Sequence, residues 1–212
     1  MDYRTVKNDA SAEMIERKSK FIGYCRPVKN QEEAIGFINE ISEMHRQATH
    51  NEYAYILRED NIMRYSDDGE PAGTAGMPVL EIIKKEGLTD VCVVVTRYFG
   101  GILLGAGGLV RAYAKSAKLG IEAACPVEMI KCTSFMVKCN YNDYGKIEFA
   151  INNEGYIIKD SSFEESVHIT VAVKMGEEER FIKTINDISG GSSEITMLYN
   201  EYVMKEIGKK NI

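Results

Sequence analysis

The chain has 212 residues, of which 44% are hydrophobic and 27% are charged, the composition of an ordinary soluble globular protein with one large or two small domains. Its net charge of -6, from 26 basic and 32 acidic residues, argues against indiscriminate binding to nucleic acid, although a local basic face remains open. The four prolines and the lack of any low-complexity tract exclude long disordered arms.

The N-terminus and the cysteines indicate the compartment. Residues 1–7 are polar, unlike a secretory signal, and the apolar stretch over residues 102–110 is too short to span a membrane, which takes about 20 residues. The five cysteines are odd in number and show no Cys-x-x-Cys spacing, so neither a disulfide framework nor a zinc site is predicted. We therefore expect a cytoplasmic protein without membrane contact, whose reduced thiols pack as small apolar side chains.

The first part of the chain predicts two strands and two helices around one irregular loop. Asn30 followed by Glu33 resembles a capping box at the start of the first helix. Residues 66–78 contain three glycines and two prolines, which excludes a regular element there. The hydrophobic periodicity predicts, in order, a strand over 13–28, a helix over 31–46, a strand over 49–57 and a short helix over 79–85.

The segment from Val91 to Ile121 departs most from the average of the chain. A β-branched run of strand length leads through a glycine-rich turn into a helix that we predict over residues 107–124. The segment contains no Asp or Glu but four basic residues. The helix has two faces: Leu109, Tyr113, Ala117 and Ile121 face a core, and Arg111, Lys115, Lys118 and Glu122 form the opposite stripe.

The rest of the chain predicts a second domain. Pro126 cannot continue the preceding helix, so we place the boundary there and expect domains over residues 1–126 and 127–212. The predicted elements are strands over 131–140, 156–160, 167–174 and 194–203, with helices over 143–153 and 177–189. Their order, β-α-β-β-α-β, is the ferredoxin-like pattern, and the chain as a whole is predicted to be α+β.

The glycine turn is the first candidate site. A strand that passes through glycines into a helix N-terminus offers free N–H groups and a favourable dipole to an anion. The Walker A pattern is not met because Gly105 is followed by Ala106, and the dinucleotide pattern is not met because Val110 stands where a small residue is needed. A nucleotide site, an RNA-phosphate site and a plain tight turn beside a solvated basic stripe all stay open.

We assign an anion-binding or nucleic-acid-binding surface to this segment. Tyr98 beside Arg97 and Tyr113 beside Arg111 could stack on bases, although Tyr113 also fits a core position. The candidate residues are Arg97, Tyr98, Gly100, Gly101, Gly107, Gly108, Arg111, Lys115 and Lys118.

The acidic loop is the second candidate site. Asp67, Asp68 and Glu70 are close enough in sequence to hold Mg²⁺, which prefers hard oxygen ligands. Aspartates also bond to local backbone N–H groups in turns, and ion pairs with Arg97 or Arg111 would be a simpler use of the charges. We therefore predict neither a metal nor a cofactor.

Covalent catalysis has little support in the sequence. His50 with Cys92 or Cys25 would make a Cys–His pair, but no Gly-x-Ser-x-Gly pattern or other nucleophile motif occurs. We expect His50 to be a half-buried strand residue.

Three segments together resemble the IMPACT/YigZ family. They are residues 66–76 (SDDGEPAGTAG), 94–101 (VVTRYFGG) and 104–113 (LGAGGLVRAY), and the resemblance extends over the whole chain from the strand that begins at residues 16–21. The loop residues that carry the motif are Asp67, Asp68, Gly69, Glu70, Pro71, Gly73, Thr74 and Gly76. One departure is Glu52, which stands where the family often has a cysteine after the histidine that matches His50.

The resemblance implies a fold for each domain. The first would be similar to the second domain of a small-subunit ribosomal protein and to domain IV of elongation factor G, a left-handed β-α-β fold. The second would be a ferredoxin-like fold similar to domain V of that factor. Eukaryotic members carry an additional N-terminal domain that binds a translational-control partner, and because this chain begins at the shared domain we do not expect that partnership.

Two functions from different classes follow. The first is a non-enzymatic, translation-associated regulatory protein that binds the ribosome or structured RNA through the local basic face. The second is an enzyme for a small molecule or nucleotide, with the glycine turn as its phosphate site and the acidic loop on Mg²⁺. A protein–protein adaptor is a third hypothesis.

Overall fold

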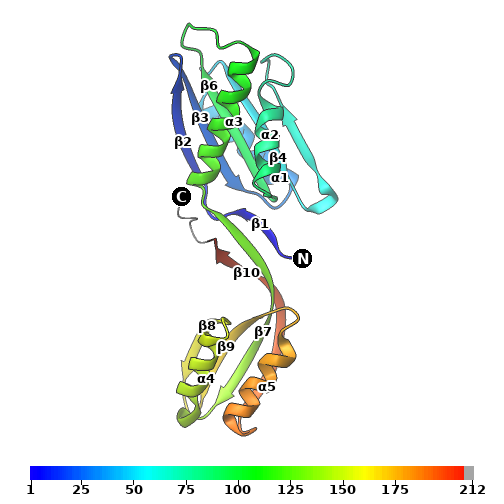
Figure 1. Cartoon of the computed structure of the whole chain (residues 1–212), viewed down its shortest axis with the longest axis vertical. Helices are drawn as coiled ribbons and strands as arrows, with labels where there is room; N and C mark the ends of the chain where they lie inside the picture. The colour runs from blue at the N-terminus through cyan, green and yellow to red at the C-terminus, as the bar shows by residue number, and fades with distance from the viewer. Residues whose placement is uncertain (208–212) are drawn as a thin grey trace. The chain divides into compact units, whose positions relative to one another are not determined.

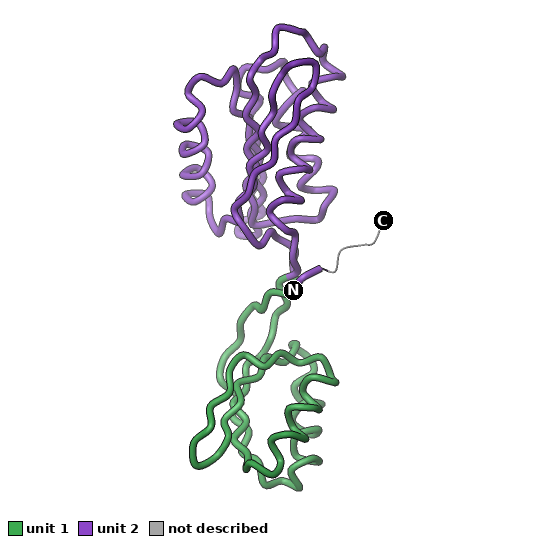
Figure 2. The backbone as a smooth tube through the Cα atoms, turned by 90° about the vertical axis from the view of Figure 1, so that its left-hand side faces the viewer, with its two compact units in different colours: residues 1–2, 129–205 green, residues 3–128, 206–212 purple. Residues whose placement is uncertain are grey.

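The computed structural model describes residues 1–207 and divides them into two compact units (Figure 2). The N-terminal unit comprises residues 3–128 with residues 206–207, and the C-terminal unit comprises residues 1–2 and 129–205. Each unit combines helices with antiparallel strands, so the predicted α+β class with two domains is confirmed. The domain limits 1–126 and 127–212 remain a prediction.

The N-terminal unit is built on a five-stranded sheet in the order β2-β3-β6-β4-β5, with antiparallel neighbours throughout. The single strand predicted over residues 13–28 is wrong, because the chain reverses at Arg17 and Lys18, whose φ angles are 44° and 65°. Hairpin turns of this kind usually use Asn or Gly, so the sequence carries no obvious turn signal. The strands of this sheet are β2 (Ala10–Glu16), β3 (Ser19–Pro27), β4 (His50–Ile56), β5 (Met63–Ser66) and β6 (Val91–Tyr98), and β1 (Tyr3–Val6) lies outside it.

Helices cover both faces of this sheet (Figure 1). Helix α1 (Gln31–Met44) packs on one face, whereas α2 (Gly76–Lys85) and α3 (Ala106–Ala123) pack on the other. Strand β6 is therefore buried on both faces, which explains its β-branched run. Its odd-numbered valines enter the core under α2 and α3, and Cys92 and Val94 enter the core under α1.

The N-terminal caps of α1 and α2 differ in their distance along the sequence from the helix that they cap. The capping interaction of α1 is confirmed, because the Asn30 side chain accepts a hydrogen bond from the N–H of Glu33 at 2.9 Å. Helix α2, in contrast, begins at Gly76, three residues before its predicted start. The carboxylate of Asp67 accepts hydrogen bonds from the N–H groups of Ala75 and Gly76 at 3.0 and 2.8 Å, so the cap comes from a residue eight positions away.

The C-terminal unit has the predicted element order β-α-β-β-α-β. In its sheet β7, β9 and β8 are neighbours in that order, and β10 also pairs with β7. The inward residues of β7 and β9 form a core with both helices, including Phe135, Ile169 and Phe181. Its elements are β7 (Pro126–Cys139), α4 (Tyr141–Asn153), β8 (Ile157–Phe163), β9 (Val167–Lys174), α5 (Glu178–Ser189) and β10 (Glu194–Glu206). No helix among residues 1–207 is long and apolar enough to cross a bilayer.

Two glycines fix the position of α3 on the sheet. A Cβ atom at Gly23 of β3 would lie 2.2 Å from the carbonyl oxygen of Ser116, and a Cβ atom at Gly120 would lie 2.6 Å from the carbonyl oxygen of Gly23. Backbone atoms on both sides leave no flexible group to move, so α3 and β3 cross in direct backbone contact.

This crossing predicts that Gly23→Ala lowers the free energy of unfolding by about 2–3 kcal/mol or more, because α3 must move away from the sheet. Gly36→Ala is the matched control: it lies inside α1 with nothing within 4 Å of the added Cβ, and it should leave stability unchanged or raise it by about 0.5–1 kcal/mol. Urea denaturation measures both, and equal stabilities would contradict the crossing.

Candidate functional site

The acidic loop and the Val91–Ile121 segment meet in space. The guanidinium of Arg97, near the end of β6, forms a buried ion pair with the carboxylate of Glu70. The hydroxyl of Tyr113, on α3, lies 2.9 Å from the same carboxylate. A loop, a central strand and a helix are therefore joined at one buried charge.

The register between β4 and β6 determines which side chains of β4 lie near the Glu70 carboxylate. His50 pairs with Arg97 and Glu52 with Val95 across β4 and β6, so both side chains face α2 and α3. His50 begins β4 and is partly buried, and its Nδ1 lies 2.6 Å from the carbonyl oxygen of Asp68. Its Nε2 is 3.9 Å from Glu70, too far for a hydrogen bond.

Glu52 is fully buried, with an exposed fraction of 0%, and burial raises the pKa of its carboxyl to about 9. The Tyr113 hydroxyl lies 2.6 Å from Glu52 and 2.9 Å from Glu70, yet it has one proton to donate. Because Arg97 neutralises Glu70, we infer that Tyr113 donates to Glu70 and that protonated Glu52 donates to the Tyr113 oxygen. The second oxygen of Glu52 has no hydrogen-bond partner within the described part of the chain.

The neutral state of Glu52 predicts a pH dependence of stability. Its folded pKa lies above its ordinary value of 4.5, so its stabilising contribution is complete below about pH 4.5 and is lost as the pH rises towards 9. Between these two pH values, each unit of rise in pH should lower the free energy of unfolding by up to about 1.4 kcal/mol. Glu52→Gln keeps an uncharged donor at every pH and should remove this slope, making the variant more stable than the wild type at pH 8.

Denaturation curves at pH 5 to 9 measure the slope. Glu43→Gln is the control, because Glu43 is exposed on α1, and it should follow the wild type. If the Glu52→Gln curves ran parallel to the wild type, the buried carboxyl would not be protonated in the folded state.

The acidic loop is organised by hydrogen bonds and an ion pair of its own side chains. The Asp67 carboxylate accepts hydrogen bonds from three backbone N–H groups between Gly73 and Gly76, and the Asp68 carboxylate accepts one from the N–H of Asn51 at 2.7 Å. With Glu70 bound to Arg97, the three carboxylates have separate partners. Within residues 1–207, no group of three or more His, Cys, Asp or Glu side chains is placed to hold a metal ion.

The small residues of the loop have backbone roles. Gly69 and Gly73 have φ angles of 86° and 76°, which other residues adopt with strain. The hydroxyl of Thr74 donates a hydrogen bond to the carbonyl oxygen of Pro71 at 2.6 Å, and Gly76 lies against the backbone of Ser66. The loop motif thus encodes a conformation.

Several residues assigned to the anion-binding surface lie elsewhere. Arg97 is only 5% exposed, because every odd-numbered position of β6 faces α2 and α3. The hydroxyl of Tyr98 lies 2.8 Å from Nδ1 of His45, and Tyr113 is fully buried, so neither ring is free to stack on a base. Gly100 lies against the backbone of Lys18, which makes it a close-packing residue.

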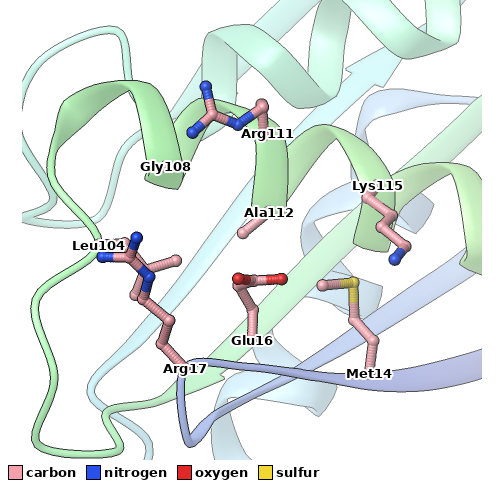
Figure 3. Close-up of a pocket in the computed structure, with 8 residues that line it drawn as sticks. All are labelled: Met14, Glu16, Arg17, Leu104, Gly108, Arg111, Ala112 and Lys115. Atoms are coloured by element: carbon pink, nitrogen blue, oxygen red, sulfur yellow. The ribbon is translucent and has the colours of Figure 1, made fainter.

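The exposed part of the expected surface is the outer face of α3. Arg111, Lys115 and Lys118 are all exposed there, although Lys118 lies 3.8 Å from Glu122. Arg17, from the turn between β2 and β3, joins Arg111 and Lys115 at a cavity of about 240 Å³ (Figure 3). We call Arg17, Arg111 and Lys115 the α3 cation cluster. No member forms an ion pair with a carboxylate among residues 1–207.

The start of α3 lies beside this cluster. Its N-cap residue, Gly105, has a φ angle of 71° and provides no side-chain cap. Gly107 is exposed, and Gly108 lines the cavity, whereas Gly101 lies in the exposed loop before the helix. The first N–H groups of the helix therefore open towards solvent close to three cations, an arrangement that favours anions.

Sequence reasoning missed three residues of these sites. Arg17 was hidden inside the predicted long strand. Glu52 shares the inward parity of Ala54 and Ile56 in β4, and that alternation is the signal that could have identified it as a buried acid. Phe99 is 45% exposed and is the most exposed aromatic residue between Val91 and Ile121.

Comparison with known proteins gives the family. Residues 17–121 match the model described as the Impact N-terminal domain, and residues 137–192 match a domain of unknown function. The IMPACT family member YvyE of Bacillus subtilis is 41% identical over 194 residues, covering 91% of this chain and 89% of that protein. The chain therefore belongs to the IMPACT family.

Other relatives agree. The IMPACT family member YigZ of Escherichia coli is 32% identical over 84% of this chain and 89% of its own length. Protein IMPACT of Xenopus laevis is 38% identical over 42% of this chain, but that match covers 30% of its length. A solved structure titled as the crystal structure of an hypothetical protein matches with a TM-score of 0.59 and 28% identity, covering 94% of this chain and 98% of that chain.

Proposed function

We propose that this protein is a non-enzymatic, translation-associated regulatory protein of the cytoplasm that binds structured RNA, free or within the ribosome. The observation that carries the proposal is the α3 cation cluster. Three cations from two elements line one cavity beside an uncapped helix start, and none forms an ion pair with a carboxylate within residues 1–207. Lys118 extends the same face along the helix.

The charge distribution supports selective binding. Phosphate contacts release counterions and provide most of the affinity of proteins for nucleic acid. The chain as a whole carries a charge of -6, so the rest of the protein repels phosphates on average. RNA should therefore approach the protein from the side of the cluster. Polar backbone N–H groups at the start of α3 add donors without adding charge.

The expected fold relationships point to the same partners. We infer that the N-terminal unit resembles a ribosomal-protein domain and domain IV of elongation factor G, and that the C-terminal unit resembles domain V of that factor. The element order and sheet order of the C-terminal unit support the second relationship. This support is an analogy between folds, and the cation cluster provides the physical argument.

RNA binding should depend on Arg111. Arg111→Glu should weaken binding to ribosomal RNA fragments across sequences, because it removes a phosphate contact and adds a repelling charge. The slope of log K against log salt concentration should become shallower by about 1–2. Gel-shift titrations at several salt concentrations measure both quantities.

Arg46→Glu is the matched control. Arg46 is also exposed and follows α1, on the other face of the sheet, and its reversal changes the net charge by the same amount. It should leave affinity and salt slope close to the wild type. Equal losses in both variants would show a diffuse electrostatic effect, and salt-independent binding or no binding would refute the proposal.

A nucleotide-binding enzyme is the second candidate, and one observation favours it. The glycine-rich start of α3 leaves N–H groups free beside Arg111 and Lys115, which suits a nucleotide phosphate as well as an RNA phosphate. The three loop carboxylates do not support the Mg²⁺ site that this enzyme would need, because they bind backbone N–H groups and Arg97.

A further inference from the structure

The cavity of the cation cluster contains one acid. Glu16 ends β2, is exposed, and lines the cavity together with Arg17, Arg111 and Lys115. In Figure 3 its carboxylate lies between Arg17 and Lys115, beneath Ala112. No ion pair or hydrogen bond of the Glu16 side chain occurs among residues 1–207. Because a carboxylate repels phosphate, Glu16 would weaken the binding of a ligand that presented only a phosphate to this cavity.

The remaining lining is apolar. Met14 and Leu104 are partly buried against the core of the N-terminal unit, and Ala112 is 3% exposed. The volume of about 240 Å³ is below that of pockets for drug-sized ligands. The cavity therefore offers an apolar surface for one flat group, an acceptor for N–H donors and cations for an anion, and a nucleotide combines these three features.

We propose that this cavity binds an unpaired guanine nucleotide, with Glu16 accepting the two N–H groups of the base edge and the cation cluster holding its phosphate. The inference rests on the proposed function and specifies its ligand. Guanine alone presents two adjacent donors, N1–H and N2–H, to one carboxylate. Adenine and cytosine place a ring-nitrogen acceptor beside the amino group, and uracil flanks its N–H with carbonyls. Unstacked bases of single strands and loops expose this edge, whereas duplexes hide it.

The test measures binding of fluorescent single-stranded RNA hexamers to the full-length protein. One hexamer contains guanine, and its matched control contains inosine, which keeps N1–H and lacks the N2 amino group. The wild type should bind the guanine RNA about tenfold more tightly or better, because a carboxylate with two hydrogen bonds discriminates on that scale. Glu16→Gln should abolish this preference while leaving binding to guanine-free RNA unchanged or tighter. Glu43→Gln should behave as the wild type.

The outcomes separate this inference from the proposed function. Equal binding of guanine and inosine RNA by the wild type, or an unchanged preference in Glu16→Gln, overturns the guanine site. If such binding is still lost in Arg111→Glu, RNA binding itself stands. A complete lack of RNA binding overturns the proposed function, and a lack of binding to both RNA and free 5′-GMP overturns the guanine site as well.

A second series replaces the hexamers with free 5′-GMP and 5′-IMP. Glu16-dependent binding of either RNA or 5′-GMP supports the guanine site. Tighter binding of RNA identifies RNA as the source of the nucleotide, and tighter binding of 5′-GMP favours the second candidate function.

Discussion

The buried carboxylate of Glu70 is the constraint on which the rest of the N-terminal unit depends. An unpaired charge at this depth would cost several kcal/mol, so the loop must stay where Arg97 of β6 and Tyr113 of α3 can reach it. Protonated Glu52 completes the network from β4. Four segments distant in sequence thereby share one polar cluster. If one member were removed, the others would be left as buried polar groups without partners, which costs free energy.

This cluster also explains the two halves of the family motif. Tyr113 and Arg111 are two positions apart on α3, so a helix turns their side chains to opposite sides. When Tyr113 is held inside by two carboxylates and Gly120 is held against β3, Arg111 and Lys115 must face solvent. The buried residues of the motif therefore fix the position of the exposed ones, and the exposed ones remain available for a ligand.

Sequence patterns correctly predicted those helices and caps whose formation depends on residues close together in the sequence. The two faces of α3 and the Asn30 cap follow from spacing alone, and the structure confirms both. The hairpin after β2 was missed because Arg17 and Lys18 adopt left-handed angles without a glycine or asparagine. Arg97 was assigned to the surface because charge usually marks exposure, whereas its strand is covered on both faces. The early start of α2 depends on Asp67, a distant contact that no local window contains.

We infer that Glu52 holds a proton inside the folded protein, so that one Tyr113 hydroxyl can interact with two carboxyl groups. Carbon-13 NMR of the glutamate side-chain carboxyls, followed from pH 4 to pH 10, tests it directly, with Glu52→Gln to assign the signal. One carboxyl should remain protonated at pH 7, titrate near pH 9 and be missing in the variant. If every glutamate carboxyl titrated close to the ordinary value of 4.5, Glu52 would be ionised in the folded protein at pH 7, and the proposed hydrogen bond from Glu52 to Tyr113 would not exist.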